Sequence, residues 1–303
     1  IKLNVQAVHY YLNAGKCIRK IFDGFSPDLV IGTGGYVTGT VLKTALKCGI
    51  KTALHESNSL PGVSTKMLAP KADLVMLGTE DAKKHLGECK KCVVTGNPLR
   101  NNIPIEEKSA ARKRLGLPDC LTILSAGGSQ GASRINEAVV HLLSYEQKKG
   151  NINHIHGYGK HGKDTFMQSL AENGVDPDNE HFIIKEYIDN MYTCMCASDL
   201  IITRAGAMTL TELMAIGRAS ILIPYPYAAE NHQYYNALTL QNANAGRIID
   251  DKELTGAVLI DTVTKLADDP ELLKLMSENA AKLSKHDAAG VILREITDLM
   301  GLE

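Results

Sequence analysis

Glycine-rich segments that follow apolar runs are the residues of this chain best suited to binding an anion. Gly127-Gly-Ser-Gln-Gly-Ala132 comes after the apolar run Leu121–Ala126 and precedes a helical pattern over Ser133–Lys149. Glycine lets backbone N–H groups approach an anion closely, and a helix N-terminus adds about half a unit of positive charge. The segment therefore predicts a turn that holds a phosphate group.

Two further turns have the same form. Gly32-Thr-Gly-Gly-Tyr36 follows the run Asp28–Ile31, and Arg204-Ala-Gly-Ala-Met-Thr-Leu-Thr-Glu212 follows Asp199–Thr203. Glycine is common where strands turn into helices, so one such turn is weak evidence of binding. Three of them favour two phosphorylated ligands rather than one.

Apolar, β-rich runs alternate with helix-length segments along the whole chain. This alternation is typical of parallel sheets covered by helices on both faces. The strands are predicted at 28–32, 51–54, 74–77, 92–95, 121–126, 152–155, 181–185, 200–203, 220–223 and 246–249.

A length of 303 residues fits two domains. Proline and asparagine in Gly96–Ile105 break both periodicities, which places the boundary near Leu99. We predict an α/β protein with domains at 1–99 and 100–286, two Rossmann-like folds facing a cleft, and ligands at the carboxyl ends of the strands. The tail Pro270–Leu299 is predicted to be helical with an interruption near Gly290, and its last part, 287–303, to pack back on the first domain.

Composition excludes several functions. A net charge of -1 gives no reason to expect a nucleic-acid partner. Apolar runs fall short of the roughly 18 residues that span a bilayer. Seven scattered cysteines favour free thiols in a reducing cytoplasm. Cys89-Lys-Lys-Cys92 lacks the four ligands of a structural zinc site, and Asp176-Pro-Asp178 lies in a polar loop, so we expect no metal.

Six motifs in fixed order connect the chain to a known family. They are His55-Glu-Ser-Asn58 with Pro61-Gly62, Thr95-Gly-Asn-Pro-Leu-Arg100, Gly127–Ala132, Tyr187-Ile-Asp-Asn-Met191, Arg204–Glu212 and Asn231-His-Gln-Tyr-Tyr-Asn-Ala237. Over essentially its whole length the chain resembles the MurG family of N-acetylglucosaminyltransferases. The resemblance implies a GT-B fold and transfer, with inversion, of N-acetylglucosamine from UDP-N-acetylglucosamine to an undecaprenyl-linked muramoyl-pentapeptide in peptidoglycan synthesis, without a cofactor.

The resemblance also assigns donor-binding residues. The main chain of the Gly206 turn would face the UDP diphosphate, and Glu212 would face the ribose. The main chain of Ile188 would face the uracil, so the side chain of Ile188 should be incidental. Polar side chains would surround the phosphate and the sugar. The donor set is Asn58, Arg100, Ser129, Ile188, Gly206, Ala207, Met208, Thr209, Leu210, Thr211, Glu212, Gln233 and Asn236.

For the acceptor diphosphate the resemblance implies the other two glycine turns, namely Thr33, Gly34, Gly35, Tyr36, Gly128, Ser129, Gln130 and Gly131. Two departures from the family pattern matter. Ser57 stands where the family usually has glutamine, and nothing like the family's first glycine loop, with a histidine favoured as the base, precedes Ile1. As it stands the polypeptide is expected to be inactive or nearly so, with Glu56 the carboxylate closest to the role of base.

A lipid-linked acceptor implies a membrane surface as a partner. Val5, Val8 and Leu12 would share one face of a helix over Lys2–Lys20, with basic residues near its end. We therefore expect peripheral binding to the anionic, cytoplasmic face of the bacterial cell membrane. Two alternatives stay open: a nucleotide-sugar epimerase of the same fold, and a non-catalytic UDP-sugar-binding subunit that needs a partner chain.

Overall fold

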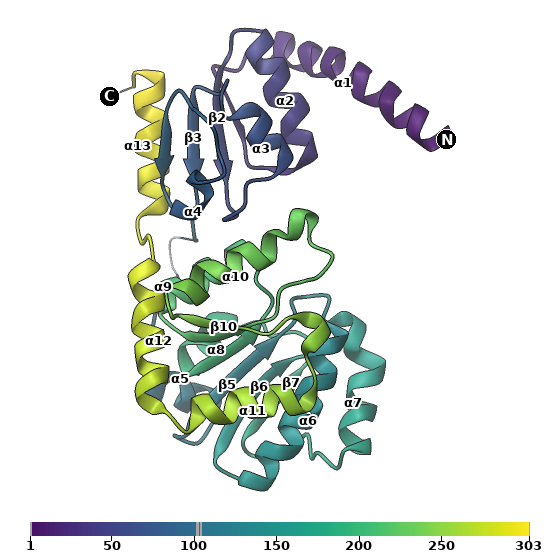
Figure 1. The fold of residues 1–303 in the computed structure, drawn as a ribbon, viewed down its shortest axis with the longest axis vertical. Helices are drawn as coiled ribbons and strands as arrows, with labels where there is room; N and C mark the ends of the chain where they lie inside the picture. Colours follow the sequence, from purple (N-terminus) through teal and green to yellow (C-terminus); the bar gives the residue numbers. More distant parts are fainter. Residues whose placement is uncertain (1, 101–102, 104, 303) are drawn as a thin grey trace. The chain divides into compact units, whose positions relative to one another are not determined.

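The structure is a computed structural model that describes residues 2–100, 103 and 105–302. The chain divides into two compact units (Figure 1). Unit 1 is Ile1–Leu99 with Lys285–Glu303, and unit 2 is Arg100–Ser284. Each unit is a parallel sheet with helices on its faces, as the alternation in the sequence predicts.

Unit 1 is built on parallel strands in the order β1-β2-β3-β4 within its described residues. Its elements are α1 (Lys2–Phe25), β1 (Leu29–Gly32), α2 (Gly35–Lys47), β2 (Lys51–Glu56), α3 (Val63–Leu68), β3 (Leu74–Leu77), α4 (Glu80–Lys83), β4 (Cys92–Val94) and α13 (Ala288–Met300).

Alternate residues of β3 face opposite sides of this sheet. Val75 and Leu77 pack with α2 and α3, whereas Leu74 and Met76 pack against Ile292, Ile296 and Leu299 of α13. The last helix thus covers the face that α2 and α3 leave open, and Figure 1 shows it alongside β3. An amphipathic helix at the far end of the sequence thereby completes the core of the first unit.

Unit 2 is built on parallel strands in the order β10-β9-β8-β5-β6-β7 within its described residues. Its strands are β5 (Leu121–Ala126), β6 (Ile152–Gly157), β7 (Phe182–Lys185), β8 (Leu200–Thr203), β9 (Ala219–Leu222) and β10 (Gly246–Ile248). Its helices are α5 (Lys108–Leu115), α6 (Ser133–Lys149), η1 (Lys160–Gly162), α7 (Lys163–Glu172), α8 (Met191–Ala197), α9 (Ala207–Ile216), η2 (Ala229–Asn231), α10 (His232–Asn242), η3 (Asp251–Glu253), α11 (Gly256–Ala267) and α12 (Pro270–Leu283).

Both faces of the second sheet are buried. Ile123 and Ile202 belong to the cluster formed with α6, α7 and α11, and Leu124 and Ile201 to the cluster formed with α8, α9 and α10. Continuous apolar strands are what a parallel sheet covered on both faces requires.

Every predicted strand is present, with ends that differ by at most a few residues, and α6 has the predicted bounds. The predicted helix break near Gly290 is wrong. The break lies between Leu283 and Ala288, and Gly290 is inside α13. Lys285 and Ala288 pack against Gly96 at φ +83°, so the chain leaves the helical path where it contacts unit 1. A Cβ at Gly290 would collide with the Asp287 carboxylate, so glycine at this position leaves room for that side chain.

Candidate functional site

The strand order of unit 2 creates a switch point between β5 and β8. From β5 the chain runs outward through β6 and β7, then returns to β8 on the opposite side of β5 and continues to β9 and β10. Ala126 pairs with Thr203 at the carboxyl ends of these two strands, so the glycine turns that follow them begin side by side. Open α/β sheets bind ligands in the crevice at such a point.

The turn after β8 presents the N-terminus of α9. Gly206 is the N-cap in an extended conformation, and the first turn contains no acidic side chain. Early helical N–H groups have no partner within their helix, which leaves those of Ala207, Met208 and Thr209 suited to an anion. Leu210 and Thr211 are used differently: the Leu210 N–H donates to Gly206 O and the Thr211 hydroxyl to Ala207 O. Both side chains are buried.

Glu212 has a partner that the motifs did not single out. The Tyr192 hydroxyl donates to Glu212 Oε1 at 2.9 Å. Burial raises the pKa of Tyr192, and the bond to Glu212 raises it further, while the charge of Arg100 lowers it. Arg100 is thus within electrostatic range of the pair. A carboxylate accepts up to about four hydrogen bonds, so Glu212 keeps capacity for a ribose. Tyr192 directly follows the Tyr187–Met191 motif, which is the only sequence signal for it.

Helix α10 holds the turn after β8 from the side. Gln233 Oε1 accepts from Ala205 N at 3.2 Å and from Tyr225 N at 3.0 Å. Asn236 Nδ2 donates to Ala205 O at 3.2 Å, and Asn236 is buried. The two backbone donors fix the orientation of the Gln233 amide and leave its NH₂ group as a donor for a ligand. The expected contact of Asn236 with the sugar is therefore less favoured than a role in shaping the turn.

Arg204 joins this turn to the loop after β9. Its guanidinium donates to the carbonyls of Ile223 and Pro224, both at 3.2 Å, and pairs with Asp251. It also lies 5.6 Å from the ring centre of Tyr225. Sequence reasoning missed Asp251 because it is 47 residues from Arg204.

The turn after β5 is closed by contacts between glycines. Gly128 and Gly131 have φ of +93° and +85°, and the Gly131 N–H donates to Gly128 O at 2.9 Å. A Cβ at Gly131 would collide with Tyr158 O, and one at Gly159 would collide with Gly131. The carbonyls of Ser129 and Gln130 accept from the loop after β6, at 3.2 and 3.0 Å, which leaves both residues exposed at the tip of the turn.

A buried chain of polar groups lies in the strands that lead to these turns. Glu146 Oε2, His154, the Ser125 hydroxyl and His156 are joined in that order by contacts of 2.7 Å each. Burial raises the pKa of Glu146 and lowers the pKa of His156 well below its ordinary value. The chain links α6, β5 and β6, and so fixes β5, which leads to the turn 127–132, against its neighbouring strand β6.

Ile188 is buried, and its side chain packs against Gly157, where an added Cβ would lie 3.2 Å from Ile188 Cδ1. The side chain therefore fills the core beneath the loop after β7. The expectation that it is incidental to binding the base stays a prediction.

In unit 1 the turn after β1 is more open. Gly32 is packed tightly, since a Cβ there would collide with Thr38 and Leu42. Gly34 and Gly35 have φ of +92° and +78°, and nothing lies within 4 Å of a Cβ added at either position. Tyr36 is 88% exposed. The predicted acceptor residues 33–36 belong to unit 1 and 128–131 to unit 2, each at the carboxyl end of its own sheet.

Glu56, predicted as the closest candidate for the base, is buried at the end of β2. Its Oε1 accepts from the backbone and the side chain of Asn58, both at 3.1 Å. Its Oε2 accepts from Gly62 N at 3.1 Å and from the Thr65 hydroxyl at 2.6 Å. Both oxygens therefore hold the β2–α3 loop, and Asn58 takes part in that arrangement. This geometry favours a positioning role for Glu56 over proton transfer.

Within the part of the chain that the structure describes, no three His, Cys, Asp or Glu side chains gather as a metal site, and no helix is long and apolar enough to cross a membrane.

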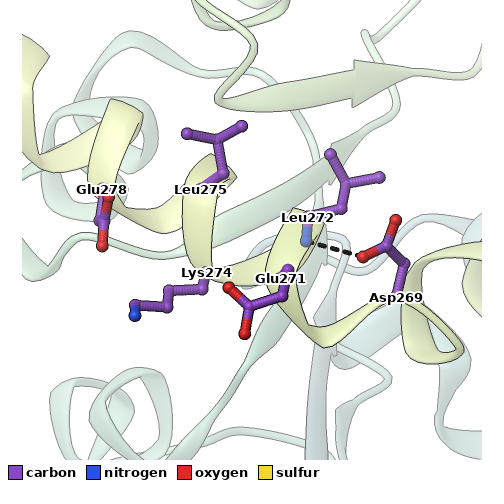
Figure 2. Close-up of a pocket in the computed structure, with 6 residues that line it drawn as sticks. All are labelled: Asp269, Glu271, Leu272, Lys274, Leu275 and Glu278. Atoms are coloured by element: carbon purple, nitrogen blue, oxygen red, sulfur yellow. Dashed lines mark hydrogen bonds between the residues drawn. The ribbon is translucent and has the colours of Figure 1, made fainter.

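A surface hollow of about 460 Å³ is lined by α12 and the residue before it. Figure 2 shows the side chains of these residues. There Asp269 caps α12 by accepting from Leu272 N at 2.9 Å, so its carboxylate serves the helix.

Comparisons with known proteins agree with this arrangement. The glycosyltransferase family 28 C-terminal domain matches residues 122–292, and the N-terminal domain of that family matches residues 2–77. The structure of MurG from Acinetobacter baumannii superimposes with a TM-score of 0.80 at 27% identity, over 96% of this chain and 79% of that one. Fold and matched domains together define a glycosyltransferase with the GT-B fold.

Curated relatives identify the family within this class of glycosyltransferases. A UDP-N-acetylglucosamine--N-acetylmuramyl-(pentapeptide) pyrophosphoryl-undecaprenol N-acetylglucosamine transferase from Desulforamulus reducens is 39% identical over 92% of this chain and 76% of its own length. One from Desulfitobacterium hafniense is 41% identical over the same shares. The chain belongs to this family, the MurG family. A UDP-GlcNAc 2-epimerase from Neisseria meningitidis has a TM-score of 0.64 at 14% identity, over 95% of this chain and 81% of that one, which shows a common fold alone.

Proposed function

We propose that this chain transfers N-acetylglucosamine from UDP-N-acetylglucosamine to the lipid-linked N-acetylmuramyl-pentapeptide, with inversion, in peptidoglycan synthesis. One observation carries the proposal: the open N-terminus of α9 lies at the switch point of a sheet whose family model is a glycosyltransferase. Identity near 40% over most of the chain favours the transferase over the epimerase, whose likeness is limited to the fold.

The donor would bind at the turns after β5 and β8. Backbone N–H groups of Ala207, Met208 and Thr209 would hold the diphosphate, and Glu212, oriented by Tyr192, would accept from the ribose hydroxyls. The Gln233 amide NH₂ would reach the sugar, since the two backbone N–H groups on its oxygen fix its direction. The main chain at Ile188 would face the uracil.

Departure of UDP places negative charge on the diphosphate, and the site supplies positive potential for it. The α9 N-terminus contributes a partial positive charge, and the exposed Arg100 a full one. Ser129 adds a hydroxyl from the exposed tip of the turn after β5. Since these groups already stabilise the leaving group, we propose that transfer needs neither a metal ion nor another cofactor. Activity that survives treatment with EDTA is the expected result, and loss restored by Mg²⁺ would contradict it.

The acceptor would bind to unit 1. The turn 33–36 offers an open glycine backbone for the lipid-linked diphosphate, and the exposed apolar side chains of Ile31 and Val37 lie next to it in the sequence. We assign Glu56 to holding the loop between β2 and α3 rather than to removing the proton from the attacking hydroxyl, because both of its oxygens accept hydrogen bonds within that loop.

A lipid-linked acceptor requires a membrane surface, and we propose that α1 supplies the contact at the cytoplasmic face of the bacterial membrane. Lys16, Arg19 and Lys20 are exposed near its end, with Ile21 at 62% and Phe25 at 76% exposure. The side chains of the predicted apolar face, Val5, Val8 and Leu12, lie outside those described. Each basic residue near an anionic surface contributes about 1 kcal/mol, which gives reversible docking.

Titration calorimetry tests the donor assignment on the whole chain. UDP-N-acetylglucosamine is expected to bind, and the GDP-linked sugar to bind at least about tenfold more weakly, since the main chain at Ile188 is placed to discriminate between bases. Equal affinity for the two nucleotides would overturn the assignment. Transfer of labelled N-acetylglucosamine to the lipid-linked acceptor by the native protein tests the reaction itself.

A further inference from the structure

Two cysteines in unit 1 form a pair that the transfer reaction does not use. Cys89 lies in the loop after α4, and Cys92 is the first residue of β4. Both are half-buried against the same apolar cluster, which includes Leu86 and Val94. The Cys89 thiol donates to Gly87 O at 3.5 Å. The two cysteines, three residues apart in the sequence, therefore share one half-buried environment.

The two residues between the cysteines hold the pair in place. Lys90 Nζ lies 2.9 Å from Asp73, and Lys91 Nζ lies 2.6 Å from Glu295 of α13. The carbonyl of Lys91 accepts from Val75 N at 2.8 Å, which continues the pairing of β3 with β4. These two ion pairs and the backbone hydrogen bond hold the turn between the two cysteines in one conformation.

We propose that Cys89 and Cys92 form a dithiol site that low-molecular-weight disulfides oxidise to an intramolecular disulfide. The Cys89 thiolate attacks a sulfur of the small disulfide, forms a mixed disulfide and releases one small thiol. The Cys92 thiolate then attacks Cys89 Sγ, forms the internal bond and releases the second small thiol. Two electrons pass from the protein pair to the oxidant, and the two protein thiol protons end on the released thiols or in solvent.

The environment of the pair sets the order of the two attacks. Burial raises the pKa of Cys92 to about 11, and the neighbouring Cys89 contributes to the rise. Because the thiolate is the nucleophile, a raised pKa makes Cys92 a weak nucleophile at neutral pH. Once Cys89 is in a mixed disulfide it no longer carries a proton or a charge, which removes part of the effect that keeps Cys92 protonated. Cys89 therefore reacts first and Cys92 completes the bond.

The other cysteines provide internal controls. Cys17 is exposed, Cys120 lies 3.8 Å from His181, and Cys194 and Cys196 are buried. A single exposed thiol such as Cys17 forms a mixed disulfide but has no second thiol to complete the reaction. An internal disulfide without a lasting mixed disulfide therefore identifies the Cys89–Cys92 pair.

The test treats the whole folded chain with oxidised glutathione, blocks remaining thiols, and maps disulfides by mass spectrometry of peptides. The wild type is expected to give a Cys89–Cys92 disulfide, Cys92→Ser a stable glutathione adduct on Cys89, and Cys89→Ser no adduct on Cys92. Closure in the wild type should accelerate as the pH rises from 7 to 9, because the thiolate is the attacking form. Cys120→Ser is the control that should match the wild type.

A stable adduct on Cys89 in the wild type, or an adduct on Cys92 in Cys89→Ser, would overturn the proposal. Reduction with dithiothreitol should restore both thiols. The oxidised chain should bind UDP-N-acetylglucosamine as the reduced chain does, because the pair lies in unit 1. The binding measurement therefore distinguishes failure of the dithiol proposal from failure of the proposed donor site.

Discussion

The two units use the same connection, a strand followed by a glycine turn and a helix, but they hold it differently. In unit 2, the turns after β5 and β8 are fixed by residues from other elements: Gly159 against Gly131, and Gln233 on Ala205. In unit 1, Gly34 and Gly35 have open space around them, and the turn is held locally, by the Thr38 hydroxyl, which donates to Gly34 O at 2.5 Å. A rigid nucleotide suits the first arrangement, and a long lipid-linked ligand suits the second.

The largest difference is expected from placing alanine in each turn. Gly131→Ala adds a Cβ that collides with the Tyr158 carbonyl at φ +85°, and should cost about 3 kcal/mol or more of unfolding free energy. Gly35→Ala meets no neighbour and should cost about 1 kcal/mol from backbone strain alone. Urea unfolding monitored by circular dichroism measures both. Equal costs would mean that the two turns are held alike.

Glu56→Gln tests the positioning role in unit 1. The amide has one oxygen, so part of the four-bond arrangement around Glu56 is lost, and unfolding free energy should fall by about 2 kcal/mol while UDP affinity stays unchanged. Glu88→Gln, an exposed change in the same unit, is the matched control. Full stability together with lost transfer activity would instead support the role of base.

Glu212→Gln tests the donor role in unit 2. Removing the charge from the ribose acceptor should weaken UDP binding by about 1–3 kcal/mol, tenfold to a hundredfold, without unfolding the chain. Tyr192→Phe, which keeps the ring but removes the hydroxyl on Glu212, should cost about 1 kcal/mol. Calorimetry with UDP gives both values. Glu278→Gln, a change at an exposed side chain of α12, serves as the control. An unchanged dissociation constant in Glu212→Gln would refute the ribose contact.

Acid should loosen the buried chain beneath the turns of unit 2. The pKa of His156 in the folded state lies well below 6.5, so its contribution to stability is present above pH 6.5 and is lost as the pH falls below it. The raised pKa of Glu146 acts in the opposite sense, which makes a variant comparison necessary. Between pH 6.5 and 5.5 the wild type should lose about 1 kcal/mol that His156→Asn does not lose. Parallel pH profiles for the two proteins would exclude His156 as the cause.

Membrane binding through unit 1 is tested by vesicle affinity. Lys16→Glu with Arg19→Glu should weaken the free energy of binding to vesicles that contain anionic lipid by about 2 kcal/mol or more at low salt, as measured by sedimentation. Lys148→Glu with Lys149→Glu, in the last turn of α6, changes the charge equally and should leave vesicle binding unaltered. If the whole native protein ignores anionic vesicles at low salt, α1 does not dock on lipid.

Local patterns in the sequence were sufficient for the elements that position the site. The strand before Gly127 and the helix after Ala132 follow from apolar runs and glycine, which act over a few residues. Contacts between distant residues were not predictable in this way. Asn236 faces Ala205 rather than solvent, Arg204 finds Asp251, and the helix break moves from Gly290 to Ser284–Asp287 because of contacts with Gly96. Each of these depends on tertiary packing that a single sequence does not encode visibly.

Amide hydrogen exchange with and without UDP-N-acetylglucosamine tests the central claim most directly. If unit 2 binds the nucleotide at its switch point, exchange should slow at Ala207–Thr209 and in the turn 127–132, and should stay unchanged at residues 33–36 as long as no acceptor is added. Protection confined to the turn 33–36, or no protection at the start of α9 at saturating donor, would contradict the account.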